Sequence, residues 1–353
     1  MSADELTLAS WTRRLALAGL VLCLLVVVLG AYVRLNAAGL SCPDWPGCYG
    51  AASPALITPD ASAQAANVHM PVDVGKAWRE MIHRYAAGTL GLIIAALAVL
   101  ALTTRGRLVS LPFAFTLFGV LIVQAVLGML TVTLRLTPLI VTAHLVFGMT
   151  TLALLAWLAF GLKAGSPPHA AARLPRRLAL AALIVLAMQI ALGGWTSSNY
   201  AALGCPDFPT CQGRWWPPTD FAHAFVLWRG VDLHYEGGVL GAPARAAIQL
   251  AHRLGACAAT LMLAWAAAIT LRRAAPRRAR LAASAVVCFL ILQLAIAIAM
   301  VRDGFPLALA TAHNAGAALL LLATVGLYNA LSTWPATRAA TPSANETARV
   351  NPH

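Results

Sequence analysis

Long apolar runs dominate the pattern of hydrophobic and polar positions along the chain. Eight runs reach about 19 residues or more, which lets an α-helix cross a hydrocarbon core about 30 Å thick. We therefore predict eight transmembrane helices, at residues 15–35, 81–102, 108–134, 139–162, 178–196, 246–271, 281–301 and 305–331. The first run is too long for the apolar core of a signal peptide and lacks a small-residue cleavage site, so we predict that it is retained as a helix.

The chain also contains an internal repeat. Segment 41–48 (Ser-Cys-Pro-Asp-Trp-Pro-Gly-Cys) has a similar copy 163 residues later, at 204–211. Three further landmarks return after 169 residues: His83-Arg84 at His252-Arg253, the Thr-Ala-His of 142–144 at 311–313, and Gln124 at Gln293. Offsets shared by independent landmarks indicate a duplication. Each half has four predicted helices, and because four is an even number, both halves enter the membrane in the same direction, as in a parallel repeat.

The repeat and the apolar runs together predict the fold class. We expect an all-α integral membrane protein whose eight transmembrane helices form two tandem, parallel four-helix bundles. The N-terminal half covers residues 1–163 and has an outer loop at 36–78. A basic, proline-containing linker at 164–177 leads to the C-terminal half, 178–353, which has an outer loop at 197–245.

Composition and charge support this fold class and predict the sides of the membrane. Hydrophobic residues make up 60% of the chain and charged residues 10%, against about 25% charged residues in soluble domains, which excludes a soluble globular protein. Both termini of an eight-helix chain lie on one side, and 15 of the 25 Lys and Arg residues fall there. Basic short loops mark the cytoplasmic side. The net charge of +13 therefore reflects topology and does not indicate nucleic-acid binding.

Four histidines lie in the predicted helices: His83, His144, His252 and His313. Each is about two turns or less from the outer end of its helix, at a rise of about 1.5 Å per residue. Ionisable groups at membrane depth usually face a functional interior. Two imidazoles at one depth can hold a flat ligand from both faces, and imidazole is an axial ligand of haem iron. Zinc would want three or four converging ligands, so two histidines in each half predict two haem sites.

Arginines adjoin two of these histidines. Arg84 and Arg253 follow His83 and His252 directly. One interpretation is that each arginine extends to the membrane boundary; the other is that each binds a haem propionate with its planar guanidinium. In the first half only, two further cations stand nearby, Lys76 and Arg79.

The surroundings of the two sites differ at one position. Glu80 stands one helical turn before His83, whereas Gln249 stands at the same place before His252. Glu80 either pairs with a neighbouring arginine or acts as a general acid/base or a stabiliser of positive charge. Because the duplicate carries an uncharged amide, we predict that the second site binds a non-reacting cofactor and that the chemistry belongs to the first half.

Four of the seven cysteines form two pairs in the predicted outer loops, Cys42 with Cys48 and Cys205 with Cys211. Their spacing is neither that of attached haem c nor a typical zinc spacing. An oxidising compartment permits disulfides. Two interpretations stay open: a structural disulfide that shapes each loop, or a redox-active thiol pair. The other three cysteines lie inside apolar runs, where we expect them to be small buried hydrophobic residues.

The combination of motifs resembles the haem A synthase family. The resemblance covers nearly the whole chain except its tails, and the motifs that carry it are Gly-Ala-Tyr-Val-Arg-Leu-Asn-Ala-Ala-Gly-Leu-Ser-Cys-Pro-Asp-Trp-Pro-Gly-Cys at 30–48, Glu80-x-x-His83-Arg84, Thr142-Ala-His144, Leu192-Gly-Gly-Trp-Thr196, His252-Arg253 and Thr311-Ala-His313.

The resemblance implies a reaction and roles for the site residues. One ring methyl of haem O would be oxidised by successive hydroxylations and loss of water to a formyl group, giving haem A for cytochrome c oxidase. A haem b cofactor would be bound by His252 and His313, and the substrate haem would lie near His83 and His144. Glu80 matches the catalytic carboxylate of the family. Both cysteine pairs match family pairs, but some members lack them, which argues against an obligatory catalytic role.

We expect a bacterial inner-membrane protein. Because the basic residues concentrate on the side of the termini, both termini are predicted to be cytoplasmic and the two long loops to face outward. The protein's expected partners are the lipid bilayer and haem O, and the further candidates are a haem O synthase, an electron donor or acceptor, and other copies of the chain. No nucleic-acid partner is expected. The alternative functions are a two-haem cytochrome b that carries electrons to or from a quinone without altering a haem, and, less favoured, a transporter.

Overall fold

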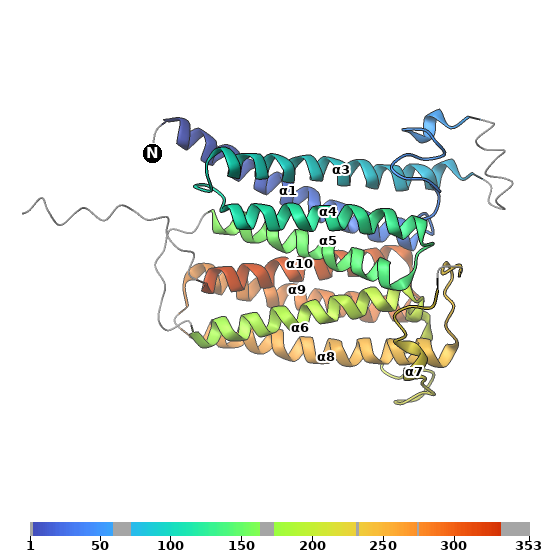
Figure 1. Ribbon diagram of the computed structural model, residues 1–353. Helices are drawn as coiled ribbons and strands as arrows, with labels where there is room; N and C mark the ends of the chain where they lie inside the picture. The colour runs from blue at the N-terminus through green and yellow to red at the C-terminus, as the bar shows by residue number, and fades with distance from the viewer. Residues whose placement is uncertain (1–2, 59–71, 163–172, 231–232, 274, 333–353) are drawn as a thin grey trace, which may run out of the picture.

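The computed structural model describes residues 3–58, 72–162, 173–230, 233–273 and 275–332. Eight long helices run side by side through these ranges (Figure 1): α1 (Ala3–Leu35), α3 (Val74–Thr103), α4 (Leu111–Thr133), α5 (Pro138–Gly161), α6 (Arg173–Ser198), α8 (Ala242–Arg272), α9 (Arg277–Arg302) and α10 (Leu307–Leu331). All eight are long and apolar enough to cross a membrane, which confirms the predicted spans. The same ranges contain three short helices and no β-strand: η1 (Pro54–Leu56), η3 (Ala201–Gly204) and α7 (Phe221–Ala224).

Several helices extend beyond the apolar runs that predicted them. Helix α3 begins at Val74 because the side chain of Asp73 caps it, accepting a 3.0 Å hydrogen bond from the Lys76 backbone N–H. Helix α8 carries Pro243 in its first turn, where the missing N–H costs no helical hydrogen bond. The ends of both predicted outer loops are therefore helical. Most of the predicted linker 164–177 lies outside the described residues, and its last part, 173–177, belongs to α6.

The helices form two groups of four neighbours. In the first group, α1 and α4 each pack against both α3 and α5; in the second, α8 packs against α6 and α9, and α10 also packs against α6 and α9. Contacts of α10 with α1 and α5, and of α5 with α6, join the groups. This arrangement is consistent with the predicted pair of tandem four-helix halves, joined through the first and fourth helix of each half.

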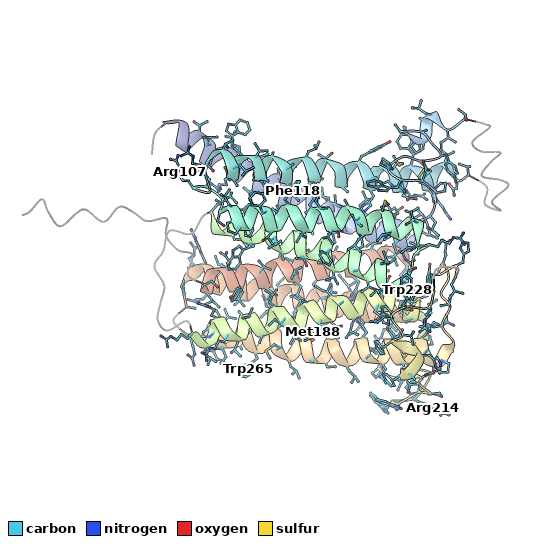
Figure 2. The ribbon with its side chains drawn as sticks, in the orientation of Figure 1. Arg107, Phe118, Met188, Arg214, Trp228 and Trp265 are labelled. Atoms are coloured by element: carbon cyan, nitrogen blue, oxygen red, sulfur yellow. A yellow bond between two sulfur atoms is a disulfide. The ribbon has the colours of Figure 1, made fainter. Side chains whose placement is uncertain are left out.

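Both disulfide-containing loops lie at one end of the bundle, which we call the loop end (Figure 1). The N-terminus lies at the opposite end. In Figure 2, which has the same orientation, Arg214 and Trp228 stand at the loop end and Arg107 stands at the opposite end.

The packed core occupies the half of the bundle away from the loop end. Its fully buried residues come from early α1, late α3 and late α5, and from the corresponding parts of the second group, for example Ala16, Leu97, Leu155, Leu263 and Leu327. Buried alanines among them let the helices approach closely. The loop-end half is packed less completely, and it contains the cavity.

Candidate functional site

A single connected cavity of about 2350 Å³ occupies the loop-end half of the bundle. All eight long helices and both disulfide loops line it. Sites for one drug-sized ligand have roughly 300–1,000 Å³, so the cavity is large enough for two large ligands. All four predicted histidines line it: His83 from α3, His144 from α5, His252 from α8 and His313 from α10.

Each half of the chain contributes two of these histidines, His83 and His144 from the first half and His252 and His313 from the second. That the two members of each pair hold one ligand between them stays a prediction. The Nδ1 atoms of His83, His144 and His313 are buried and have no partner with hydrogen-bond geometry within the described residues. A buried polar atom without a partner costs about 1–3 kcal/mol, so these rings fit a site that binds a ligand.

The donor set fits the axial ligands of haem iron. Among the residues that the structure describes, no group of three or more His, Cys, Asp or Glu side chains converges. A structural zinc site uses four such ligands and a catalytic site three, whereas a six-coordinate haem needs two imidazoles. Two histidine pairs in one large apolar cavity therefore suit two haem groups.

Glycines face three of the four imidazole rings. A Cβ atom added at Gly30 of α1 would lie 2.8 Å from Cε1 of His83, and one at Gly193 of α6 would lie 3.3 Å from Cε1 of His252. Gly128 has a similar relation to His144, at 3.2 Å. Gly30 and Gly193 are 163 residues apart, the offset of the disulfide segments, so this spacing is a sequence signal for the site in addition to the histidine motifs.

Two glutamines contact the second pair of histidines. The Nε2 atom of Gln189 lies 3.1 Å from Nδ1 of His252 and donates a 3.0 Å hydrogen bond to the His252 carbonyl. The Nε2 atom of Gln293 lies 3.4 Å from the other ring nitrogen, Nε2, of His313 and donates a 3.1 Å hydrogen bond to the His313 carbonyl. In the first half the position equivalent to Gln189 is Val26, which has no polar side chain. Gln293 is one of the repeat landmarks, but its place in the sequence did not indicate this role.

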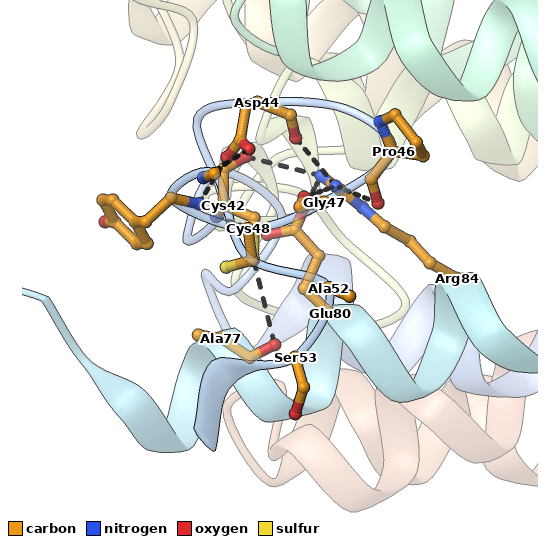
Figure 3. Close-up of a disulfide and its surroundings, with 12 residues drawn as sticks. Cys42, Asp44, Pro46, Gly47, Cys48, Ala52, Ser53, Ala77, Glu80 and Arg84 are labelled. Carbon is orange, nitrogen blue, oxygen red and sulfur yellow. Dashed lines mark hydrogen bonds and ion pairs between the residues drawn. A yellow bond between two sulfur atoms is a disulfide. The ribbon is translucent and has the colours of Figure 1, made fainter. Parts of the chain in front are cut away.

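Glu80 is buried at the edge of the cavity and both its oxygens are engaged (Figure 3). Oε1 pairs with Nη2 of Arg84 at 2.6 Å, and Oε2 accepts a 2.9 Å hydrogen bond from the Cys42 backbone N–H. The carboxylate thus connects α3 to the first disulfide loop. Its counterpart Gln249 is equally buried, and its Oε1 has no partner among the described residues.

The two predicted arginines hold the disulfide loops. Arg84 donates hydrogen bonds to the carbonyls of Asp44 (2.8 Å), Gly47 (2.5 Å), Pro46 and Cys42. Arg253 donates to four carbonyls of the second loop: Asp207 and Thr210 (both 2.7 Å), Cys205 and Pro209. Both line the cavity, so their predicted contact with haem propionates stays a prediction, but most of their donors are already used. Lys76 and Arg79 do not line the cavity.

The cysteine pairs form disulfides, Cys42–Cys48 and Cys205–Cys211, each with Cα atoms 4.6 Å apart. An aspartate organises each small loop: Asp44 accepts backbone N–H bonds from 49 and 50, and Asp207 from 212 and 213. The Thr210 hydroxyl, which donates to Asp207, holds the pKa of that carboxyl below its ordinary value. Burial raises the pKa of the Tyr49 phenol, and the nearby Glu80 adds to the shift.

Comparison with known proteins identifies the family. The family model described as cytochrome oxidase assembly protein, COX15-CtaA, matches residues 13–325. A haem A synthase of Shewanella oneidensis is 40% identical over 322 residues, which cover 90% of this chain and 94% of that protein. Haem A synthases of Methylobacterium radiotolerans and Rhizorhabdus wittichii are 31% and 27% identical, over 85% and 90% of this chain and 84% and 91% of those proteins. The chain therefore belongs to the COX15-CtaA family of cytochrome oxidase assembly proteins.

Proposed function

We propose that this protein is a haem A synthase, an oxidoreductase that converts a ring methyl of haem O to a formyl group by successive hydroxylations and loss of water. One observation carries the proposal. A single cavity contains two histidine pairs, and only the first pair has a carboxylate one helical turn away. A pure electron carrier needs two similar haem sites, whereas an enzyme needs one site that binds a cofactor and one that reacts. The names of the relatives agree with this function.

The second half is proposed to hold the resident cofactor, haem b, through His252 and His313. Support comes from the amides of Gln189 and Gln293, each of which contacts both the ring and the backbone carbonyl of its histidine. Partners of this kind orient a metal-binding imidazole and commonly change metal affinity by about 10–100-fold. When bound, haem b supplies one-electron redox chemistry to the cavity.

The first half is proposed to bind haem O between His83 and His144. The Oε1 atom of Gln124, the duplicate of Gln293, and the Nδ1 atom of His144 have no hydrogen-bond partner within the described residues, and Val26 stands beside His83 where the repeat would place Gln189. A substrate must enter and its product must leave, so a site with less firmly oriented ligands suits exchange. Gly30 and Gly128 leave the space in which the two rings lie.

Glu80 is proposed to move the protons of the reaction. Each hydroxylation replaces a C–H bond of the methyl group by C–OH and is a two-electron oxidation of that carbon, so it needs an oxidant from outside the chain; dehydration of the geminal diol then removes one water. A carboxylate beside the reacting carbon can accept a proton at Oε1 or Oε2 and return it to a departing oxygen. Arg84 and the Cys42 N–H orient this carboxylate at the edge of the cavity.

We further propose that the loop end faces the outside of a bacterial inner membrane and that both termini are cytoplasmic, because short basic loops join the helices at the other end. The oxidation of haem O needs an electron acceptor or donor, and a haem O synthase is the enzyme expected to supply the substrate. These partners, and association with further copies of the chain, are part of the proposal.

Pigment extraction tests the proposed function. The chain would be expressed in bacterial cells that contain a haem O synthase but no other haem A synthase, and haems extracted from the membranes would be separated by chromatography. Haem A should appear with the wild-type chain and should be absent with His83→Ala. Purified protein that contains only two permanent haem b groups, in membranes without haem A, would instead indicate an electron-carrying cytochrome b.

A further inference from the structure

Among the residues that the structure describes, three arginines line the cavity, and they differ in how many of their donors are used. They are Arg34, Arg84 and Arg253. Arg84 makes four hydrogen bonds to loop carbonyls and one ion pair, and Arg253 makes four hydrogen bonds. Arg34 makes a single long hydrogen bond, from Nη2 to the Ser197 carbonyl at 3.4 Å. Its Nε atom is buried and has no partner among the described residues. Arg34 is thus the lining cation with donors to spare.

The position of Arg34 relates it to the first histidine pair. It lies four residues after Gly30 on α1, and residues four apart share one face of a helix. Gly30 contacts the ring of His83, so Arg34 stands one turn, about 6 Å, closer to the loop end than this ring. A haem ligated by His83 extends several ångströms from its iron, and its two carboxylates lie along one edge.

Arg34 also stands where the two halves meet. Its guanidinium lies over the ring of Tyr200, 4.4 Å from the ring centroid, which orients the planar group. Ser197, which accepts its hydrogen bond, is the residue equivalent to Arg34 in the repeat, 163 positions later. The duplication therefore left one arginine at the junction, and it belongs to the helix that faces His83.

We infer that Arg34 binds a propionate carboxylate of the haem held by His83 and His144, and so orients the substrate in the first half. This inference rests on the proposed function, because it takes haem as the ligand. The planar fork of guanidinium matches a carboxylate with two parallel hydrogen bonds, and Nε is one of the donors of that fork. A carboxylate held at the junction prevents rotation of the flat ring about its axial ligands. It thereby determines which peripheral carbon faces Glu80.

Binding of esterified and free haem tests this inference. Purified full-length protein carrying its resident haem would be titrated in detergent with iron protoporphyrin IX or with its dimethyl ester, and binding followed in the Soret band. Wild-type protein should bind the free acid about tenfold or more tightly than the ester, as expected for one charge-assisted hydrogen-bonded pair. Arg34→Gln should remove this preference by weakening only the free acid. Arg34→Lys should keep part of it, and Arg302→Gln, at an exposed arginine outside the cavity, should change nothing.

Other outcomes would contradict either the role of Arg34 or the proposed function. If Arg34→Gln weakens both ligands equally, Arg34 is a structural tether to Ser197 and Tyr200, and the inference is wrong. If Arg34→Gln leaves the binding of both free and esterified haem unchanged, a residue other than Arg34 binds the propionate of the first-site haem. The same conclusion follows if the variant releases the resident haem while binding at the first site stays normal. Failure of the wild-type protein to bind any added haem would contradict the proposed function instead. If Arg34→Gln does not fold, Arg34→Lys still reports the ratio between acid and ester, and a wild-type ratio near one overturns the inference.

Discussion

The carboxylate of Glu80 and the guanidinium of Arg84 form a 2.6 Å ion pair one turn apart on α3, and both side chains also hydrogen-bond to the backbone of the first disulfide loop. In the second half Arg253 holds the equivalent loop without such a partner, because Gln249 stands where Glu80 would be. The second loop is therefore held by its arginine without a carboxylate at this position. The negative charge at position 80 is an addition that loop packing does not require.

We predict that Glu80→Gln folds and retains haem b but forms no haem A. The amide nearly preserves size, and the second half already accommodates it at Gln249. Loss of the ion pair and of its hydrogen bonds should cost about 1–3 kcal/mol of stability. Loss of a general acid/base should slow the reaction about 10²–10⁴-fold. Extracted haems should show accumulated haem O or a hydroxylated intermediate.

The control for this variant is Gln249→Glu, which should leave haem A formation largely intact. Accumulated haem O would place Glu80 in the first oxidation, and accumulated hydroxylated haem would place it in a later one. Normal haem A production by Glu80→Gln would reduce Glu80 to a structural partner of Arg84.

His252→Ala and His313→Ala should each lose the tightly bound haem, because a six-coordinate iron does not persist with one axial ligand removed. Absorption spectra of purified protein should show a reduced or altered low-spin signal. His83→Ala and His144→Ala are the matched variants and should keep that signal. A spectrum unchanged in His252→Ala would move the cofactor to the first half.

Replacing Gln189 by leucine should loosen haem b without removing it. The contacts of the amide with the ring and carbonyl of His252 are lost, so we expect faster haem release and a shifted midpoint potential, with affinity lower by about 10–100-fold. Haem transfer to apomyoglobin and redox titration measure these quantities. Gln189→Glu keeps an oxygen that can accept from the ring N–H but has no N–H to donate to the carbonyl, so it should recover at most part of the affinity. Equal haem release from wild type and Gln189→Leu would contradict the assignment.

Gly30→Ala should impair the first site. The added Cβ would lie 2.8 Å from the His83 ring, so the ring or helix α1 must shift, at a cost of about 1–3 kcal/mol. Binding of added haem and production of haem A should fall, while haem b content stays constant. Gly119→Ala on α4 is the control, since an added Cβ there meets no atom within 4 Å and Gly119 does not line the cavity. Equal effects of the two substitutions would mean that the close approach has no importance for the site.

The disulfides predict the pattern of thiol labelling. Before reduction, the denatured protein should expose at most three thiols, those of Cys23, Cys257 and Cys288; after reduction it should expose seven. Cys205→Ser should lower stability by about 2 kcal/mol, as expected for opening a short loop, and should lower haem b retention because Arg253 is held by that loop. Seven reactive thiols in protein isolated under oxidising conditions would refute the disulfides.

Sequence alone was sufficient for the features that depend on local composition or on repetition. About twenty apolar residues in succession have few alternatives to a membrane-spanning helix, so all eight spans were predictable. The offset of 169 residues relates His83 to His252 and His144 to His313 by spacing along the chain alone. The helix ends were less predictable, because capping by Asp73 and proline at α8 continue the helices past the apolar runs.

Only the tertiary structure decided which polar groups meet. Arg84 is adjacent to His83 in the sequence, which suggested a role at the haem, but its donors reach carbonyls about forty residues earlier, in the disulfide loop. Arg34 is far from every histidine in the sequence and yet lines the cavity beside Tyr200. Hydropathy depends on each residue's own side chain, whereas a hydrogen bond depends on the folded path of two distant segments, and no spacing along the chain encodes that path.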